Sequence, residues 1–173
     1  RRPALGGDMP IAIVPHGDDK KALVERFNRR MQEGGSPWGF YVAPEPPWIP
    51  PRKGQRVWRE LYLAVERGDH GEACVGGFAL KPQAWLVHGR ERTVTDWQGP
   101  VSLGAIDNRY ATMGLRMLRD MLERQPLLYS WGHGDDEAPM VRMLRKMGWL
   151  MHPTPFLLRV CRPARFLRRN GYL

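Results

Sequence analysis

The stretch WQGPVSLGAIDNRYATMG, residues 97–114, decides the fold of this chain. Its first part, residues 97–106, has the composition of a strand, with Pro100 and Gly104 inside it. Proline and glycine within a strand mark an edge, a bulge or a place where another group approaches the backbone closely. A polar turn follows, and from Arg109 the pattern is that of a helix start. The sequence therefore predicts a strand, a short turn and a helix N-terminus.

This predicted helix N-terminus has the features of a phosphate-binding site. The first N–H groups of a helix have no intrahelical acceptor, and the helix dipole is positive at that end, so a pyrophosphate is attracted there. Arg109 would add a fixed positive charge, and Gly114 lacks a Cβ, which lets a ligand come close. Arg116 and Arg119 follow within the helix, where they can reach peripheral phosphates.

Hydrophobic periodicity assigns the remaining elements. Before the deciding stretch we expect a strand at 11–14, a helix at 19–32 capped by Asp18, a Pro- and aromatic-rich extended segment at 37–54, strands at 57–66, 73–80 and 83–87, and a return strand at 93–96. After it we expect a helix at 114–123, a strand at 127–131, a helix at 137–147, a strand at 156–161 and a short basic helix at 163–169. This order predicts an α+β or mixed α/β sheet.

Composition narrows the class of protein. The 173 residues suggest one domain, and a net charge of +9 favours an acidic partner such as nucleic acid, an anionic surface or a phosphorylated small molecule. No apolar run reaches the roughly 18–20 residues of a membrane helix. Cys74 and Cys161, both in apolar runs, predict buried packing residues in a reduced compartment, which points to the cytoplasm. The opening Arg-Arg-Pro indicates a fragment of a longer protein.

In the deciding stretch, the sequence resembles the GNAT acyltransferase superfamily. The acyl-CoA signature of that family is Arg or Gln, two residues, Gly, one residue, then Gly or Ala, directly after a strand. Arg109 and Gly114 match the ends of this signature, and Thr112 stands where the first Gly is usual. The family continues with a strand and a helix that ends in Gly-Phe, and here the corresponding pair is Gly148-Trp149. Leu144 stands where the family often has a Tyr that serves the leaving thiolate as general acid.

The resemblance implies a fold and a donor site. The fold would be a GNAT-like mixed, mostly antiparallel sheet with a central parallel, splayed strand pair, 97–106 and 127–131, flanked by helices. One domain would span 1–173, with 1–17 and 162–173 as possible tails or linkers. Acetyl-CoA or another acyl-CoA would lie between the splayed strands. The residues implied in its binding are Leu103, Gly104 and Ala105 for the pantetheine arm, Tyr110, Ala111, Thr112, Met113 and Gly114 for the pyrophosphate, and Arg109, Arg116 and Glu137 around them.

The implied reaction is direct acyl transfer to an amine or hydroxyl acceptor, without a metal, by a GNAT-type N-acyltransferase. A general base must accept a proton from the acceptor, ideally with a pKa near the working pH. His133 follows strand 127–131 on a Gly-flanked loop, and its reference pKa of about 6.5 suits this role. Glu60, on strand 57–66, is the second candidate. As an alternative, His133 only bonds a helix cap. The sequence does not identify the substrates. It is compatible with a long acyl chain on the donor, and with an amino sugar or an amino acid as the acceptor.

Two other functions stay open at this point. The departures at Thr112 and Leu144 favour an acyl-CoA-binding or scaffolding module without catalysis. The arginines near the C-terminus favour a nucleic-acid-binding domain whose affinity falls steeply with salt. The densest group of them consists of Arg159, Arg162, Arg165, Arg168 and Arg169. Charge alone is weak evidence for this, because no zinc-finger, RNP-type or basic-zipper pattern accompanies it.

Overall fold

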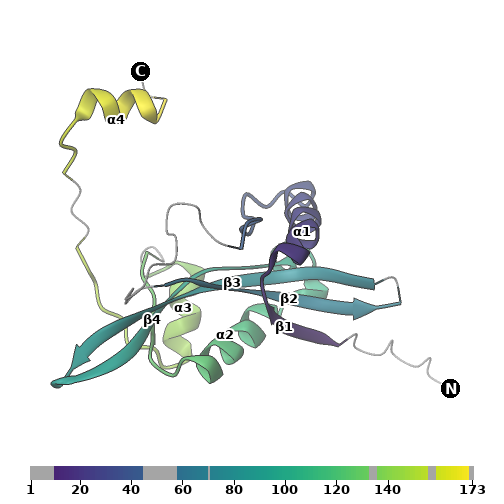
Figure 1. Cartoon of the computed structure of the whole chain (residues 1–173), viewed down its shortest axis with the longest axis horizontal. Coiled ribbons are helices and arrows are strands. Elements are labelled where there is room, and N and C mark those ends of the chain that lie inside the picture. Colours follow the sequence, from purple (N-terminus) through teal and green to yellow (C-terminus); the bar gives the residue numbers. More distant parts are fainter. Residues whose placement is uncertain (1–9, 45–57, 70, 133–135, 156–158, 172–173) are drawn as a thin grey trace. The chain divides into compact units, whose positions relative to one another are not determined.

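Five strands form one sheet in the order β1-β2-β3-β4-β5 (Figure 1). A computed structural model describes residues 10–44, 58–69, 71–132, 136–155 and 159–171 of the chain. These residues divide into two units, Arg1–Trp131 and Gly132–Leu173. The sheet lies in the first unit and consists of β1 (Ile11–Pro15), β2 (Glu60–Gly68), β3 (Gly71–Val87), β4 (Arg90–Ser102) and β5 (Leu128–Tyr129).

The sheet is mostly antiparallel, with one parallel pair. Strands β1 to β4 pair antiparallel with their neighbours, and β4 pairs parallel with β5. This confirms the predicted mixed, mostly antiparallel sheet with a parallel pair. The hairpin between β3 and β4 turns at His88 and Gly89, which have φ angles of 49° and 73°. Two successive positive φ angles are typical of a type I′ turn, whose twist matches the flanking strands.

Strands β3 and β4 are longer than predicted. The separate runs 73–80 and 83–87 form one strand, and the return strand 93–96 is continuous with the strand that begins at residue 97. Pro82 does not interrupt β3. Its carbonyl accepts from the N–H of Trp58 at 3.3 Å, and Trp58 lies just before β2, which begins at Glu60. The missing N–H of Pro82 faces that same end of β2, so no bond to β4 is lost.

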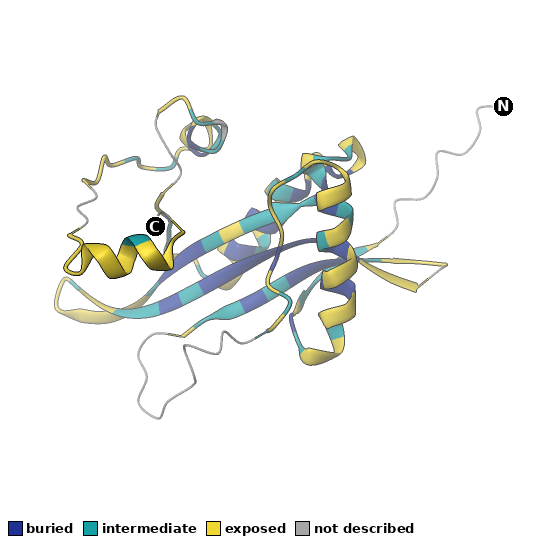
Figure 2. Cartoon of the chain, turned by 90° about the horizontal axis from the view of Figure 1, so that it is seen from above, coloured by how far each residue is buried: buried dark blue, intermediate teal, exposed yellow. Residues whose placement is uncertain are grey.

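Helices cover both faces of the sheet in this unit. Figure 1 shows α1 (Lys21–Glu33) on one face and α2 (Met113–Arg124) on the other. Each helix buries an apolar stripe that follows the 3.6-residue period. The stripes are Leu23, Val24, Phe27 and Met31 in α1, and Met113, Met117, Leu118 and Met121 in α2. Figure 2 shows the other side of α1 exposed above the buried centre of the sheet.

The start of α1 differs from the prediction. A 3₁₀ turn, η1 (Asp18–Lys20), precedes the helix, and its N-cap is Gly17. The Asp18 carboxylate makes no cap bond but pairs with the Lys21 ammonium at 2.8 Å. The predicted Asp18 cap is therefore wrong, because the turn already begins at Asp18 and the cap position falls on Gly17.

The second unit contains the two predicted helices, α3 (Pro139–Lys146) and α4 (Pro163–Arg169). Both begin with a proline at the first helical position, where its missing N–H has no cost. Of the predicted strand 156–161, residues 156–158 lie outside the described residues, and residues 159–161 are not in a strand. No described helix is both long enough and apolar enough to span a bilayer. That the two units form the single predicted domain stays a prediction.

Candidate functional site

The parallel pair β4–β5 is short and ends abruptly. Its backbone register consists of Thr95 opposite Leu128 and Asp96 opposite Tyr129. The next bond is made by a side chain, because the Ser130 hydroxyl donates to the carbonyl of Trp97 at 2.8 Å. Within the described residues, β4 then continues to its end with a partner strand only on its β3 side. The two strands thus part after Asp96, as expected for a splayed pair.

A bulge shapes the part of β4 that lies beyond this point. The register with β3 passes from Gln98 opposite Ala79 to Val101 opposite Gly77, so β4 has one extra residue there. Gly99, in the extra segment, has a φ of 52°, a conformation that favours glycine. At about 3.3 Å per residue, the open edge from Asp96 to the end of β4 is about 20 Å long. An extended ligand can pair with the backbone of this edge, which lies next to α2.

The strand ends earlier than predicted. Strand 97–106 stops at Ser102, and Leu103, Gly104 and Ala105 form a 3₁₀ turn, η2 (Leu103–Ala105). The carbonyl of Leu103 accepts from the N–H groups of Ile106 and Asp107, so it is already used inside the turn. The prediction that these three residues lie in a strand is therefore wrong, and their contact with the pantetheine arm stays a prediction. The edge that β4 offers lies before them.

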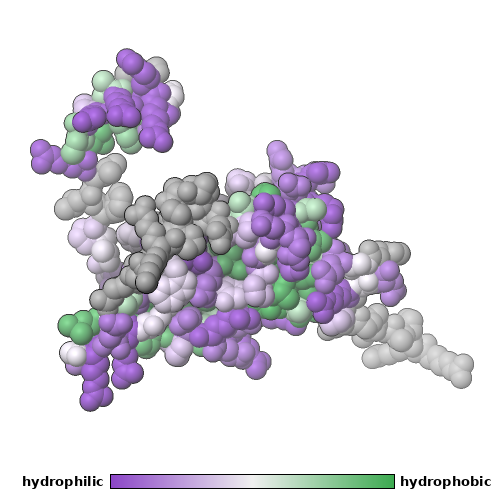
Figure 3. Space-filling view, in the orientation of Figure 1, coloured by the Kyte–Doolittle hydropathy of each residue, from purple (hydrophilic) through white to green (hydrophobic). Residues whose placement is uncertain are grey.

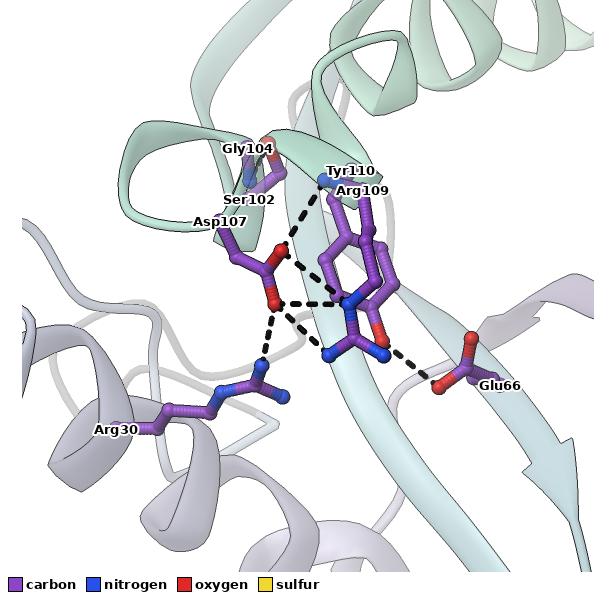
Figure 4. Close-up of polar contacts among 7 residues, drawn as sticks. All are labelled: Arg30, Glu66, Ser102, Gly104, Asp107, Arg109 and Tyr110. Atoms are coloured by element: carbon purple, nitrogen blue, oxygen red, sulfur yellow. Dashed lines mark hydrogen bonds and ion pairs between the residues drawn. The ribbon is translucent and has the colours of Figure 1, made fainter.

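A second turn, η3 (Asn108–Tyr110), leads into α2 and is fixed by Asp107 (Figure 4). The Asp107 carboxylate accepts from the backbone N–H of Arg109 at 3.1 Å and from its Nη2 at 2.9 Å, and Arg30 of α1 donates to it at 2.8 Å. These bonds, those of Arg109 first, lower the pKa of Asp107 below its ordinary value. Arg109 is therefore held at the entrance to α2 by a carboxylate that stays charged.

Tyr110 anchors this turn to the sheet. Its side chain is 5% exposed, and its hydroxyl donates to Glu66 of β2 at 2.8 Å. The guanidinium carbons of Arg30 and Arg109 lie 5.8 and 5.4 Å from the centroid of its ring. Figure 4 shows Arg109 alongside Tyr110. The aromatic ring and the two cations therefore form one packed group that positions the start of α2.

Not all predicted phosphate-binding N–H groups are available. The N–H of Tyr110 donates to the carbonyl of Asp107 at 3.0 Å, and that of Ala111 to the carbonyl of Asn108 at 3.1 Å. In the described part of the chain, the N–H groups of residues 112–114 meet no backbone acceptor. A Cβ on Gly114 would meet nothing within 4 Å, so space remains open there. Residues 112–114 are thus the part of the predicted set that can still donate.

The remaining predicted donor-site residues, Arg116 and Glu137, belong to different units. Arg116 of α2 donates to the carbonyl of Ile11 in β1, so its guanidinium is directed to the sheet edge. Glu137 belongs to the second unit, before α3. His133 lies outside the described residues. No three side chains of His, Cys, Asp or Glu gather at one point among the residues described.

A polar cluster that the sequence reading missed lies where β4 and β5 part. Asp96 is 1% exposed, and its Oδ2 accepts from Gln98 at 2.6 Å and from the indole of Trp131 at 3.4 Å. Tyr129, its register partner, accepts from Gln83 at 2.6 Å. Burial, and then the Asp96 charge, raise the pKa of Tyr129, so its phenol keeps its proton at neutral pH. The sequence signal that could have indicated this cluster was Asp96, an acidic residue inside a strand that also contains apolar residues.

Glu60, the second predicted base, lies at the start of β2. Its carboxylate accepts from the indole of Trp58 at 2.8 Å and from the hydroxyl of Tyr62 at 2.9 Å. It lines a pocket of about 560 Å³ at the end of β1. Across the sheet Glu60 is opposite Leu80, which is opposite Trp97, next to Asp96. The pocket and the polar cluster are thus at the same level of the sheet.

The two cysteines differ from each other. Cys74 is buried in β3, as predicted, but Cys161 is exposed and outside any strand, so its predicted burial is wrong. We expect one thiol, that of Cys161, to react rapidly with Ellman's reagent in the native protein, and the second only on unfolding. Cys161→Ser should abolish the rapid phase. A rapid phase that persists in this variant would contradict the burial of Cys74.

The buried thiol also gives a pH dependence of stability. Burial raises the pKa of Cys74 from 9.0 to about 12. Because the folded-state pKa is the higher one, the stabilisation is complete below pH 9 and is lost as the pH rises from 9 towards 12. Over that range we expect a loss of about 1.4 kcal/mol per pH unit relative to Cys74→Ala. Urea unfolding of both proteins between pH 8 and 11 measures it, and parallel curves would refute it.

Comparison with known proteins bears on the fold alone. No family model matches the chain, and no curated protein matches it. A solved Trypanosoma brucei acetyltransferase is similar in structure, with a TM-score of 0.50, 14% identity, and coverage of 87% of this chain and 100% of that one. A GNAT family acetyltransferase from Staphylococcus aureus has a TM-score of 0.52 and 10% identity, over 88% and 100% of the two chains. With its mixed sheet and splayed parallel pair, the chain has the fold of the GNAT acetyltransferases.

Proposed function

We propose that the protein transfers an acyl group from an acyl-CoA, in the first place acetyl-CoA, to an amine or hydroxyl acceptor. The observation that carries the proposal is the end of β4–β5 pairing at Asp96 and Tyr129. From there an open strand edge leads to the first turn of α2. Solved acetyltransferases share the fold, which supports a transferase that uses acyl-CoA.

The donor would lie along β4. The pantetheine arm pairs with the open edge of residues 98–102, beyond Trp97, whose carbonyl already accepts from the Ser130 hydroxyl. Leu103, Gly104 and Ala105, in the turn that follows, stay predicted contacts of the same arm. The pyrophosphate accepts from the N–H groups of residues 112–114, where the helix dipole adds a positive potential. Arg109 supplies a fixed charge beside it. Arg116 and Glu137 remain predictions, as peripheral contacts.

The acyl carbonyl would then lie next to Asp96. The acceptor nitrogen or oxygen attacks the thioester carbon and gives its proton to the Asp96 carboxylate. The C–S bond breaks, and the leaving thiolate takes a proton. Tyr129, which keeps its phenolic proton, is the described hydroxyl next to Asp96 that can supply this proton where Leu144 cannot. His133 and Glu60 stay as alternative bases.

A thermal shift assay tests donor binding. A ligand that binds only the folded state raises its stability by RT ln(1 + [L]/Kd), about 2.7 kcal/mol at one hundred times Kd. We expect acetyl-CoA at millimolar concentration to raise Tm by several degrees, and longer acyl-CoAs reveal the preferred chain length. No shift with any of them would count against the proposal. A shift without turnover over a broad panel of amines and alcohols would favour an acyl-CoA-binding module instead.

Arg109→Ala is expected to weaken acetyl-CoA binding roughly 10- to 100-fold, because a charge-assisted contact to phosphate contributes roughly 1.5–3 kcal/mol. Arg67→Ala is the control, since Arg67 forms an exposed ion pair with Glu72 near the β2–β3 turn. Calorimetric titration of the two variants measures the difference. Equal affinities would remove Arg109 from the donor site.

The basic C-terminal helix supports nucleic-acid binding as a second candidate. No residue of α4 is buried, and Figure 3 shows many hydrophilic side chains on it. Binding of this kind would weaken linearly with log salt. A DNA or RNA affinity that does not change between 50 and 200 mM salt would exclude α4 as an electrostatic site.

A further inference from the structure

Among the described residues, Arg59 is a cation without an anionic partner. Its guanidinium carbon lies 4.1 Å from the centroid of the Tyr41 ring, which fixes the plane of the group. Its Nε is buried and has no hydrogen-bond acceptor. Within the described part of the chain, no carboxylate forms an ion pair with it. Because buried N–H donors nearly always have an acceptor, this side chain lacks a group that would complete it.

Arg59 lines the pocket of about 560 Å³ at the end of β1. The carboxylates of the same pocket are already engaged. Asp18 pairs with Lys21 at 2.8 Å, and both oxygens of Glu60 accept from neighbouring side chains. Neither carboxylate pairs with Arg59, so its guanidinium is the donor group of this pocket that is left without an anion, and a negatively charged group would bind there.

The same residue is aligned with the polar cluster at the parting of β4 and β5. Glu60 is opposite Leu80, and the N–H of Trp58 donates to the carbonyl of Pro82, so Arg59 between them is opposite Lys81. Lys81 is in turn opposite Asp96. Residues that are opposite each other in antiparallel strands share a face. With strands about 4.8 Å apart, the backbone of Arg59 is about 10 Å from that of Asp96.

We infer that the pocket holds an anionic group of the acyl acceptor, a carboxylate or a phosphate, bound by Arg59. This deepens the proposed function and rests on it, because Asp96 marks where the reacting amine would lie. A guanidinium presents parallel N–H donors that match the two oxygens of either anion. Lys81 adds a second cation between the anion and the amine. The acceptor class is a small amine that carries a carboxylate or phosphate several bonds from its nitrogen.

The test uses binding to the full chain without acyl-CoA. The probes are glycine, β-alanine, 4-aminobutyrate and 6-aminohexanoate, compared with alkylamines of equal length, and 3-aminopropyl phosphate for the phosphate arm. Calorimetry should show that one or more anionic members bind at least 10-fold more tightly than the matched alkylamine. A carboxylate or phosphate preference identifies which anion the pocket takes. If no anionic probe binds more tightly than its alkylamine, the inference is overturned.

Variants assign the binding to the residue. Arg59→Met keeps an unbranched side chain on Tyr41 and should lower the affinity of the best probe at least 10-fold, while Arg67→Met should leave it unchanged. Arg59→Lys keeps the positive charge but loses the planar guanidinium, and should lower the affinity of the best probe several-fold. This variant tests the role of Arg59 if Arg59→Met does not fold. Unchanged affinity in the folded Arg59 variants would overturn the inference. These titrations contain no acetyl-CoA, so they are independent of donor binding. If the anionic probes do not bind but acetyl-CoA does, the inference fails and the proposed function stands. If the anionic probes bind but acetyl-CoA does not, only the proposed donor site is removed.

Discussion

Asp96→Asn is expected to lower kcat about 10²–10⁴-fold and to leave acetyl-CoA binding nearly unchanged. The carboxylate lies where β4 and β5 part, is 1% exposed, and is held by Gln98 and Trp131. The amide that replaces it has almost the same shape but cannot accept a proton from the acceptor. Steady-state kinetics with an amine that shows turnover, together with calorimetry for acetyl-CoA, separate the chemical step from donor binding.

Matched variants identify the base among the three candidates. Glu60→Gln and His133→Gln are expected to cost less than about 10-fold if Asp96 is the base. If Glu60→Gln or His133→Gln causes the larger loss and Asp96→Asn retains turnover, the base lies elsewhere.

Gly104→Val is expected to cost about 3 kcal/mol of folding stability. A Cβ at this position would lie 2.5 Å from the carbonyl oxygen of Tyr110. That atom belongs to the backbone of η3, so no side-chain rotation relieves the contact. The turn between β4 and α2 would have to move, and chemical denaturation measures the cost.

Gly114→Ala is the matched control on the same segment. A Cβ there meets open space, and alanine favours a helix over glycine by about 1 kcal/mol. We expect unchanged or higher stability but weaker acetyl-CoA binding, because the methyl group occupies the space above the free N–H groups. Equal stability losses in both glycine variants would contradict the geometry of this segment.

Much of the fold follows from periodicity. The apolar stripes of α1 and α2 repeat every three or four residues, so the positions of both helices were predictable. Strand β3, by contrast, is buried without alternation over residues 74–80 and was found only as a run of apolar residues. The end of β4 was not predictable. Residues 103–106 have the composition of a strand, but the carbonyl of Leu103 accepts two backbone bonds within a turn, and the local sequence pattern does not encode this.

The candidate site was predictable only where it is local in sequence. Arg109 and Gly114 belong to one contiguous motif, so their pattern can be read directly. Asp96 is placed in the site by its pairing with β5, which is about thirty residues later in the chain. Arg59 is placed by its alignment with β3 and by the ring of Tyr41. Cross-strand register depends on bulges such as the one at Gly99, and no local pattern encodes it.

The most direct test of the account is an NMR titration of the ¹⁵N-labelled full chain with acetyl-CoA. We expect saturable shifts that are largest for the amides of residues 112–114 at the start of α2 and for residues 98–102 along the open edge of β4. Saturable shifts confined to other parts of the chain, or no shifts at millimolar acetyl-CoA, would contradict the proposed donor site.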